Sequence, residues 1–109
     1  MTQQFRRAKR TEPKIEVPRD AIADFCKRHA IRKLALFGSV LRDDFRPDSD
    51  VDVLVEFEPG HVPGLAFFGM QDELSHIFQH EVELHTPAFL SPHFRREIER
   101  AADVRYPQG

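Results

Sequence analysis

The sequence predicts an α/β sandwich, in which one sheet is flanked by helices. Apolar residues at helical spacing alternate along the chain with short segments of strand-like pattern, and no internal repeat interrupts this order. The 109 residues suffice for one domain with a modest core, and 40% hydrophobic with 31% charged residues is the composition of a globular protein. No apolar run approaches the ~18–20 residues of a membrane span, and the N-terminus lacks the apolar core of a signal peptide. We therefore expect a cytoplasmic protein.

The first helix is expected to begin at Pro18, because proline is favoured at the first helical position. Its apolar face repeats at helical spacing in Ile22, Phe25, Cys26 and His29. The helix should end near residues 29–30. Cys26 is the only cysteine, which excludes an intramolecular disulfide, and its place on the apolar face predicts a buried, unreactive thiol.

A glycine–serine turn is expected after the next strand. The run over residues 33–37 is short and apolar and stops at Gly38, which is typical of a buried strand. Ser39 can cap a short helix over residues 40–44. Residues 46–49, Arg-Pro-Asp-Ser, have the composition of a turn.

The strand predicted over residues 50–57 shows a clean alternation. One face carries Val51, Val53, Val55 and Phe57, and the other carries Asp50, Asp52, Leu54 and Glu56. The first face should lie in the core, and the second should present its two aspartates together.

The second half of the chain predicts two helices and two strands. A helix over residues 65–79 would bury Phe67, Met70, Leu74, Ile77 and Phe78. Residues 81–86 alternate again, with Val82 and Leu84 inward and with Glu81, Glu83 and His85 on the other face. A last helix opens at Ser91-Pro92, and residues 104–106 can add an edge strand.

Charge is unevenly distributed. Residues 1–19 carry a net charge of +4 and the remainder carries −6. We expect residues 1–15 to be a flexible basic tail and residues 16–109 to form the domain. The negative net charge of the domain is unfavourable for nucleic-acid binding but suits a site that recruits cations.

The stretch from Gly38 to Asp52 indicates a site for a metal–nucleotide complex. Ten residues separate Gly38-Ser39 from Asp50, and Asp50 and Asp52 are spaced by two on a strand. Glycine lets the backbone approach a phosphate closely, and a helix start behind it offers N–H donors. Two carboxylates on one face of a strand can bridge a pair of Mg²⁺ ions, or of Mn²⁺ ions, that clamp the attacking and leaving oxygens of a phosphoryl group.

Other residues near this motif have weaker assignments. Glu83 is the best candidate for a third carboxylate because its strand could neighbour the Asp50–Asp52 strand, and Glu81 on the same face stays an alternative. Arg42 could contact a phosphate or pair with Asp43 or Asp44. Ser49 is expected in the first place to be a turn or cap residue, and a role as nucleotide ligand is the second interpretation. His85 is expected to be an ordinary residue of the polar face.

The pattern Gly-Ser-x10-Asp-x-Asp, carried by residues 36–42 and 49–55, resembles the minimal nucleotidyltransferases of the DNA polymerase β-like superfamily. Within them the chain is most similar to the MntA-type antitoxins of HEPN/MNT toxin–antitoxin pairs, over roughly residues 16–107. The resemblance implies a polymerase β-like fold, with a mixed sheet of about four strands flanked by helices. It also implies Asp50, Asp52 and Glu83 as catalytic magnesium ligands, and Gly38-Ser39 at the phosphates of ATP. The implied reaction transfers AMP to a tyrosine of a cognate HEPN toxin, an RNase that this modification silences.

Two positions depart from the family pattern. The third carboxylate is usually aspartate where this chain has Glu83, and glycine commonly follows Arg42 where this chain has Asp43. The alternative function is therefore a catalytically weak or inactive subunit that neutralises its partner by binding alone. A nucleotidyltransferase for small molecules is a further alternative. Because the predicted elements use up the chain, we expect a second protein to bring the acceptor hydroxyl, in a hetero-oligomer without membrane or direct nucleic-acid binding.

Overall fold

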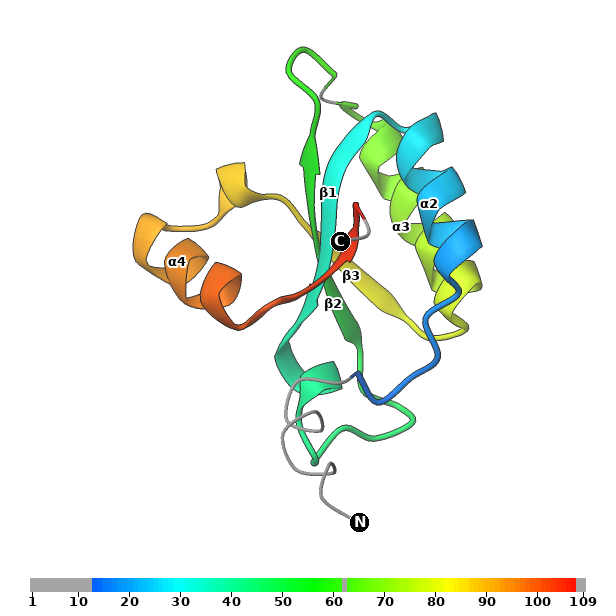
Figure 1. The fold of residues 1–109 in the computed structure, drawn as a ribbon, viewed down its shortest axis with the longest axis vertical. Helices are drawn as coiled ribbons and strands as arrows, with labels where there is room; N and C mark the ends of the chain where they lie inside the picture. Colours follow the sequence, from blue (N-terminus) through cyan, green and yellow to red (C-terminus); the bar gives the residue numbers. More distant parts are fainter. Residues whose placement is uncertain (1–12, 62, 108–109) are drawn as a thin grey trace.

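A four-stranded mixed sheet forms the centre of the protein in the computed structural model, which describes residues 13–61 and 63–107 (Figure 1). This architecture confirms the predicted fold class. The elements in chain order are α2 (Arg19–Arg28), β1 (Ile31–Phe37), the 3-10 turn η1 (Gly38–Leu41), β2 (Val51–Phe57), α3 (Ala66–Phe78), β3 (Val82–His85), the 3-10 turn η2 (Pro87–Phe89), α4 (Pro92–Ala101) and β4 (Asp103–Tyr106).

The strands lie in the order β3-β2-β1-β4. β2 runs parallel to β3 and antiparallel to β1, and β4 pairs with β1 as an antiparallel edge strand, as predicted. In this register Asp52 pairs with Glu83 on one side and with Phe37 on the other. The parallel pair therefore brings the two carboxylate-bearing strands side by side.

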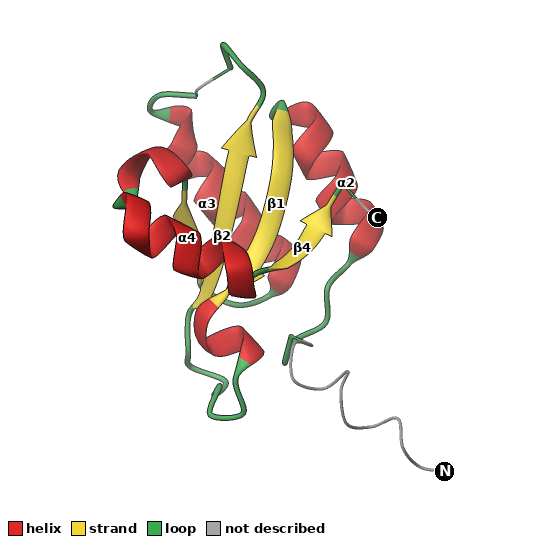
Figure 2. Cartoon of the chain, turned by 60° about the vertical axis from the view of Figure 1, so that its left-hand side comes forward, coloured by secondary structure: helices red, strands yellow, loops and turns green. Residues whose placement is uncertain are grey.

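Helices cover both faces of the sheet, but they bury unequal amounts of apolar surface. α2 and α3 pack on the face that carries Val51, Val53 and Val55, and their buried residues are Ile22, Phe25, Cys26, Met70, Leu74 and Phe78. α4 lies on the other face, in front of β1 and β2 in Figure 2. There a small second cluster joins Phe37, Leu54 and Ile98. The face of β2 with Val51, Val53 and Val55 lies in the main core, as its alternation predicts, and Leu54 on the other face contributes to the second cluster.

Helix ends follow local sequence signals. Ser91 caps α4 as predicted, because its hydroxyl accepts the backbone N–H of Phe94 at 3.3 Å. α3 ends where Gln79 adopts a left-handed conformation with φ of 57°. The predicted apolar stripes of α2 and α3 face the sheet. In α4 Ile98 is buried, whereas Phe94 and Ala101 are exposed.

The predicted helix over residues 40–44, capped by Ser39, is wrong. A 3-10 turn over Gly38–Leu41 takes its place, and Ser39 lies inside the turn without making a cap hydrogen bond. Val40 is fully buried, whereas the following residues 42–44 are exposed and charged, so no apolar face exists to continue a helix.

The structure also bears on two further predictions, the N-terminal tail and the burial of Cys26. Most of the predicted tail, residues 1–12 of 1–15, lies outside the described residues, while the backbone N–H of Lys14 donates to the carbonyl of Val40 at 2.8 Å. Cys26 is buried as predicted, and burial raises the pKa of its thiol to about 12. Among the helices of the described residues, none has the length and apolarity that crossing a membrane requires.

A polar cluster joins α2 to α3 at the surface. Arg28 donates to a carboxylate oxygen of Glu73, and Nε2 of His29 lies 3.0 Å from the other oxygen. The hydrogen bond from Arg28, assisted by that from His29, lowers the pKa of Glu73 below its ordinary value of 4.5. A carboxyl whose pKa is lowered by folding stabilises the protein at pH values above its unfolded pKa, and this contribution is lost as the pH falls through the lowered pKa.

We therefore predict that Glu73→Gln lowers the free energy of unfolding by about 0.5–1 kcal/mol at pH 7, a value reduced by the partial exposure of the pair. The difference from the unsubstituted chain should shrink below pH 4.5 and then vanish. Urea unfolding followed by circular dichroism at a series of pH values measures both effects. Asp72→Asn, the same change of charge at an exposed position of α3, is the control and should show a smaller difference.

Candidate active site

Three side chains from β2 and β3 meet at one point of the sheet. Asp52, Glu83 and His85 each offer a ligand atom, and these atoms lie within 4.8 Å of one another. The parallel register aligns Asp52 with Glu83, and the two-residue period of β3 places His85 on the same face as Glu83. Asp52 and Glu83 were predicted to share a site, and the structure brings them together.

Gly38 packs against the carboxylate of Asp52. An ideal Cβ placed on Gly38 would lie only 2.5 Å from Oδ2 of Asp52, well inside van der Waals contact. The backbone of Gly38 also has a φ of +80°, which side-chain-bearing residues rarely adopt. Glycine is therefore required here twice, for the turn that follows β1 and for the space that Asp52 occupies.

Asp50 occupies a more peripheral position. It is exposed, directly precedes β2, and does not belong to the group of three that the described residues form. Its carbonyl accepts the hydroxyl of Ser39 at 3.5 Å, which ties the Gly38–Ser39 turn to the start of β2. The next N–H, that of Val51, donates to the carbonyl of Glu81 at 2.8 Å, and the side chain of Glu81 is exposed.

Two further predicted nucleotide ligands have local partners. Nε of Arg42 donates to Asp44 at 3.2 Å in an exposed pair, one of the two alternatives that the sequence leaves open. The hydroxyl of Ser49 accepts the backbone N–H of Arg46 at 3.0 Å, so Ser49 closes the turn before β2. Both roles as nucleotide ligands stay predictions.

His85 is the residue whose position the sequence does not indicate. Its Nε2 lies 3.3 Å from Oδ1 of Asp52, and its ring packs edge-on against Phe37 with centroids 5.2 Å apart. The alternation of β3 predicts only that His85 faces the polar side. The contact with Asp52 also depends on the register between β2 and β3, which no local pattern specifies.

A cavity of about 750 Å³ opens beside Asp52. Its floor includes Gly38, and one wall is formed by α4 and by the start of β4. The lining combines apolar with charged side chains, namely Phe37, Leu41, Phe94, Ile98 and Val104 with Arg42, Glu97, Arg100 and Asp103. This volume lies within the range of sites for small molecules and cofactors.

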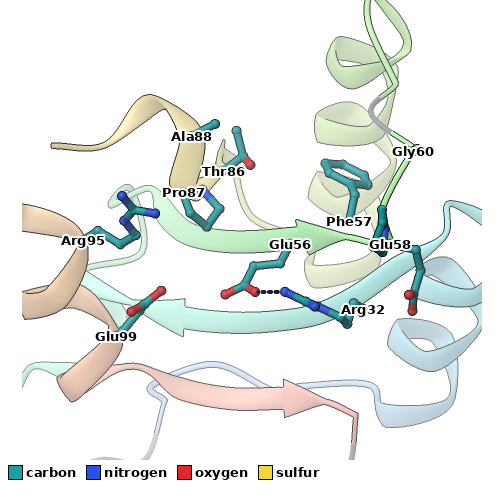
Figure 3. Close-up of a pocket in the computed structure, with 11 residues that line it drawn as sticks. Arg32, Glu56, Phe57, Glu58, Gly60, Thr86, Pro87, Ala88, Arg95 and Glu99 are labelled. Atoms are coloured by element: carbon teal, nitrogen blue, oxygen red, sulfur yellow. Dashed lines mark hydrogen bonds and ion pairs between the residues drawn. The ribbon is translucent and has the colours of Figure 1, made fainter. Parts of the chain in front are cut away.

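A second hollow of about 340 Å³ lies toward the opposite end of β2 (Figure 3). An ion pair of 2.9 Å between Arg32 and Glu56 crosses its floor, and Arg95 and Glu99 reach toward it from α4. None of the predicted site residues lines this hollow. The cavity beside Asp52 is therefore the one associated with the motif.

The donor set suits a divalent cation. Carboxylate oxygens are the ligands that Mg²⁺ and Mn²⁺ prefer, and imidazole also binds Mn²⁺ and other transition-metal ions. Asp52 and Glu83 would hold the ion with His85 beside them, and Asp50 lies close by along the chain. A bound ion would supply charge neutralisation for a triphosphate and for departing pyrophosphate.

Comparison with known proteins identifies relatives of this chain. Residues 19–104 match the family described as "Nucleotidyltransferase domain". A protein of Methanocaldococcus jannaschii named "Putative protein adenylyltransferase MJ0128" is 33% identical over 76 residues, which cover 67% of this chain and 74% of the relative. "Protein adenylyltransferase MntA" of Thermococcus cleftensis is 36% identical over 59 residues, which cover 53% of this chain and 58% of that protein.

Solved structures agree in fold. The chain matches "Structure of putative minimal nucleotidyltransferase" with a TM-score of 0.66 and 33% identity, over 77% of this chain and 85% of the other. A toxin–antitoxin crystal structure with AMP-PNP matches with a TM-score of 0.67 over 82% of this chain and 73% of the other, and its 15% identity is evidence of a shared fold alone. The family match covers most of the chain, including the Gly38–Ser39 turn and the strands that carry Asp52 and Glu83, and this chain therefore belongs to the nucleotidyltransferase domain family.

Proposed function

We propose that this nucleotidyltransferase moves AMP from ATP to a tyrosine hydroxyl of a cognate HEPN-type RNase toxin and thereby acts as its antitoxin. The observation that carries the proposal is the pairing of Asp52 with Glu83 on adjacent strands, next to the point where the backbone of Gly38 lies against the carboxylate of Asp52. The names of the relatives, which include protein adenylyltransferases, support a protein as the acceptor. The toxin–antitoxin neighbour in fold supports a toxin as that protein.

The proposed reaction is an in-line displacement at the α-phosphorus of ATP. The tyrosine oxygen forms a bond to the α-phosphorus, the bond from that phosphorus to the bridging oxygen breaks, and pyrophosphate leaves. The proton of the hydroxyl passes to a nearby base, for which the exposed carboxylate of Glu83 is the candidate. Gly38 and Ser39 line the phosphates, and Asp50, Asp52 and Glu83 hold Mg²⁺ or Mn²⁺.

The cavity beside Asp52 supports an acceptor that comes from outside. It borders Gly38 and Asp52 and continues along α4 to the exposed side chains of Phe94 and Val104. An aromatic residue from a docked protein would find apolar surface there within reach of the carboxylates. All elements of the described residues belong to the one sheet and its covering helices. A separate acceptor-binding domain does not occur among them.

Binding alone is the second candidate function. One observation favours it, namely Glu83 in place of the usual aspartate. The extra methylene displaces the carboxylate by about a bond length, whereas catalytic geometry tolerates roughly 0.5 Å. Such a subunit would occupy and silence the toxin without modifying it.

The deciding experiment incubates the protein with ATP, Mg²⁺ or Mn²⁺ and the purified product of the adjacent gene, and then weighs that product by intact mass spectrometry. We expect AMP adducts on the partner, located at tyrosine by peptide mapping. An Asp50→Asn/Asp52→Asn double variant should form no adduct, because the ligands of the metal are lost.

Three outcomes separate the candidates. Adducts that require both aspartates establish protein adenylylation. A partner that is bound and inactive but keeps its mass contradicts the transfer reaction and supports binding alone. A partner whose activity and mass are both unchanged contradicts the antitoxin function altogether.

A second prediction concerns Gly38. In Gly38→Ala, the new methyl group must displace the carboxylate of Asp52 by close to an ångström. A displacement of about 1 Å in a catalytic site can cost about a hundredfold in rate, so we expect adduct formation to fall by about that factor. The positive φ should also cost about 1–2 kcal/mol of stability, measured by urea unfolding.

Gly60→Ala is the matched control for this variant. Gly60 has a φ of +82°, and an added Cβ would meet no atom within 4 Å. It should lose similar stability but keep its rate of transfer. Wild-type rates in Gly38→Ala would show that the contact between Gly38 and Asp52 has no role in the reaction.

A further inference from the structure

His85 shares the face of β3 that carries Glu83, and its ring is held from two sides. Nε2 lies 3.3 Å from Oδ1 of Asp52, and the ring of Phe37 packs against the imidazole at a centroid distance of 5.2 Å and an interplanar angle of 63°. The side chains of His85 and Asp52 are 26% and 25% exposed, so the pair is partly desolvated yet open to a small ion. The ring is thus held at the point where the two carboxylates meet.

The spacing of the three side chains fits one cation. Their ligand atoms lie within 4.8 Å of one another. Two ligands on opposite sides of an octahedral ion, each about 2.1 Å from it, are roughly 4.2 Å apart. Small side-chain rotations therefore suffice for all three groups to bind a single ion.

An imidazole changes which ion such a site prefers. Mg²⁺ takes oxygen ligands almost exclusively, whereas Mn²⁺ accepts both carboxylate oxygens and imidazole nitrogen. We infer that His85 is a nitrogen ligand of the metal site formed by Asp52 and Glu83, and that it biases this site toward Mn²⁺ over Mg²⁺. The inference rests on the metal-dependent site of the proposed function and specifies its selectivity.

The inference also bears on the replacement of the usual aspartate by Glu83. The longer glutamate places its carboxylate away from the usual aspartate position, and His85 contributes a third ligand to the same site. One ion would then have two carboxylates and one imidazole from two adjacent strands among its ligands. Phosphate oxygens and water would fill the remaining positions.

Pulsed electron paramagnetic resonance of the Mn²⁺-loaded full chain tests the inference directly, with the methylene analogue AMP-PCP present because its phosphate chain contains no nitrogen. Nitrogen bound to Mn²⁺ produces a ¹⁴N modulation of the echo, which we expect from the unsubstituted chain and not from His85→Gln. Titration of Mn²⁺, followed by the signal of the free ion, should show a dissociation constant raised about tenfold or more in His85→Gln. The Mg²⁺ affinity, measured calorimetrically, should change by no more than about twofold.

His76→Gln is the control, because His76 is exposed on α3, its Nδ1 lies 3.1 Å from the backbone carbonyl of Asp72, and it is not part of the Asp52–Glu83–His85 group. It should keep both the ¹⁴N modulation and the Mn²⁺ affinity. Absence of the modulation in the unsubstituted chain overturns the inference, and so does an equal loss of affinity for both metals. The first measurement requires no variant to fold.

These readouts require no partner protein, so the two proposals can fail separately. A nitrogen-coupled Mn²⁺ site without adduct formation contradicts the proposed function alone. Adduct formation by a site without nitrogen coupling contradicts the role of His85 alone.

Discussion

The central position of β2 is the constraint on which the rest of the structure depends. β2 is hydrogen-bonded on both edges and covered on both faces, and its alternation sends Val51, Val53 and Val55 to one core and Leu54 to the other. The same alternation presents Asp52 to the site. A slip of one residue would exchange the two faces and bury the carboxylate among apolar side chains. The packing of the core therefore fixes the register that places Asp52 opposite Glu83.

Most of the fold is predictable from periodicity, because each strand and long helix here is strongly patterned. The parallel pairing of β2 with β3 is not, since it is a non-local choice, and the contact of His85 with Asp52 follows from it. The segment after Gly38 shows a second reason why prediction from the sequence fails. Its helix signals are real, but a single apolar turn that ends in exposed charges supports only a 3-10 turn.

The site also has a part that the sequence predicts and a part that depends on the pairing of the strands. Gly38 and Asp52 are recognisable by their spacing, and the structure adds that they touch, which explains why the motif requires glycine rather than any small residue. Membership of the nucleotidyltransferase family follows from the match over residues 19–104. Two other parts of the site come from outside the motif. The wall of the cavity belongs to α4 and β4, and Glu83 and His85, which share the group with Asp52, belong to β3.

The small cluster beneath α4 has a consequence for the wall of the cavity. α4 is held mainly by Phe37, Leu54 and Ile98, whereas the opposite helices share a much larger core. Regions with few buried apolar contacts open locally at a lower free energy than the global unfolding of a domain. α4 can therefore detach from the sheet while β2 and β3 stay paired. The wall of the cavity beside Asp52 should therefore open at a lower free energy than the core between the sheet and α2 and α3.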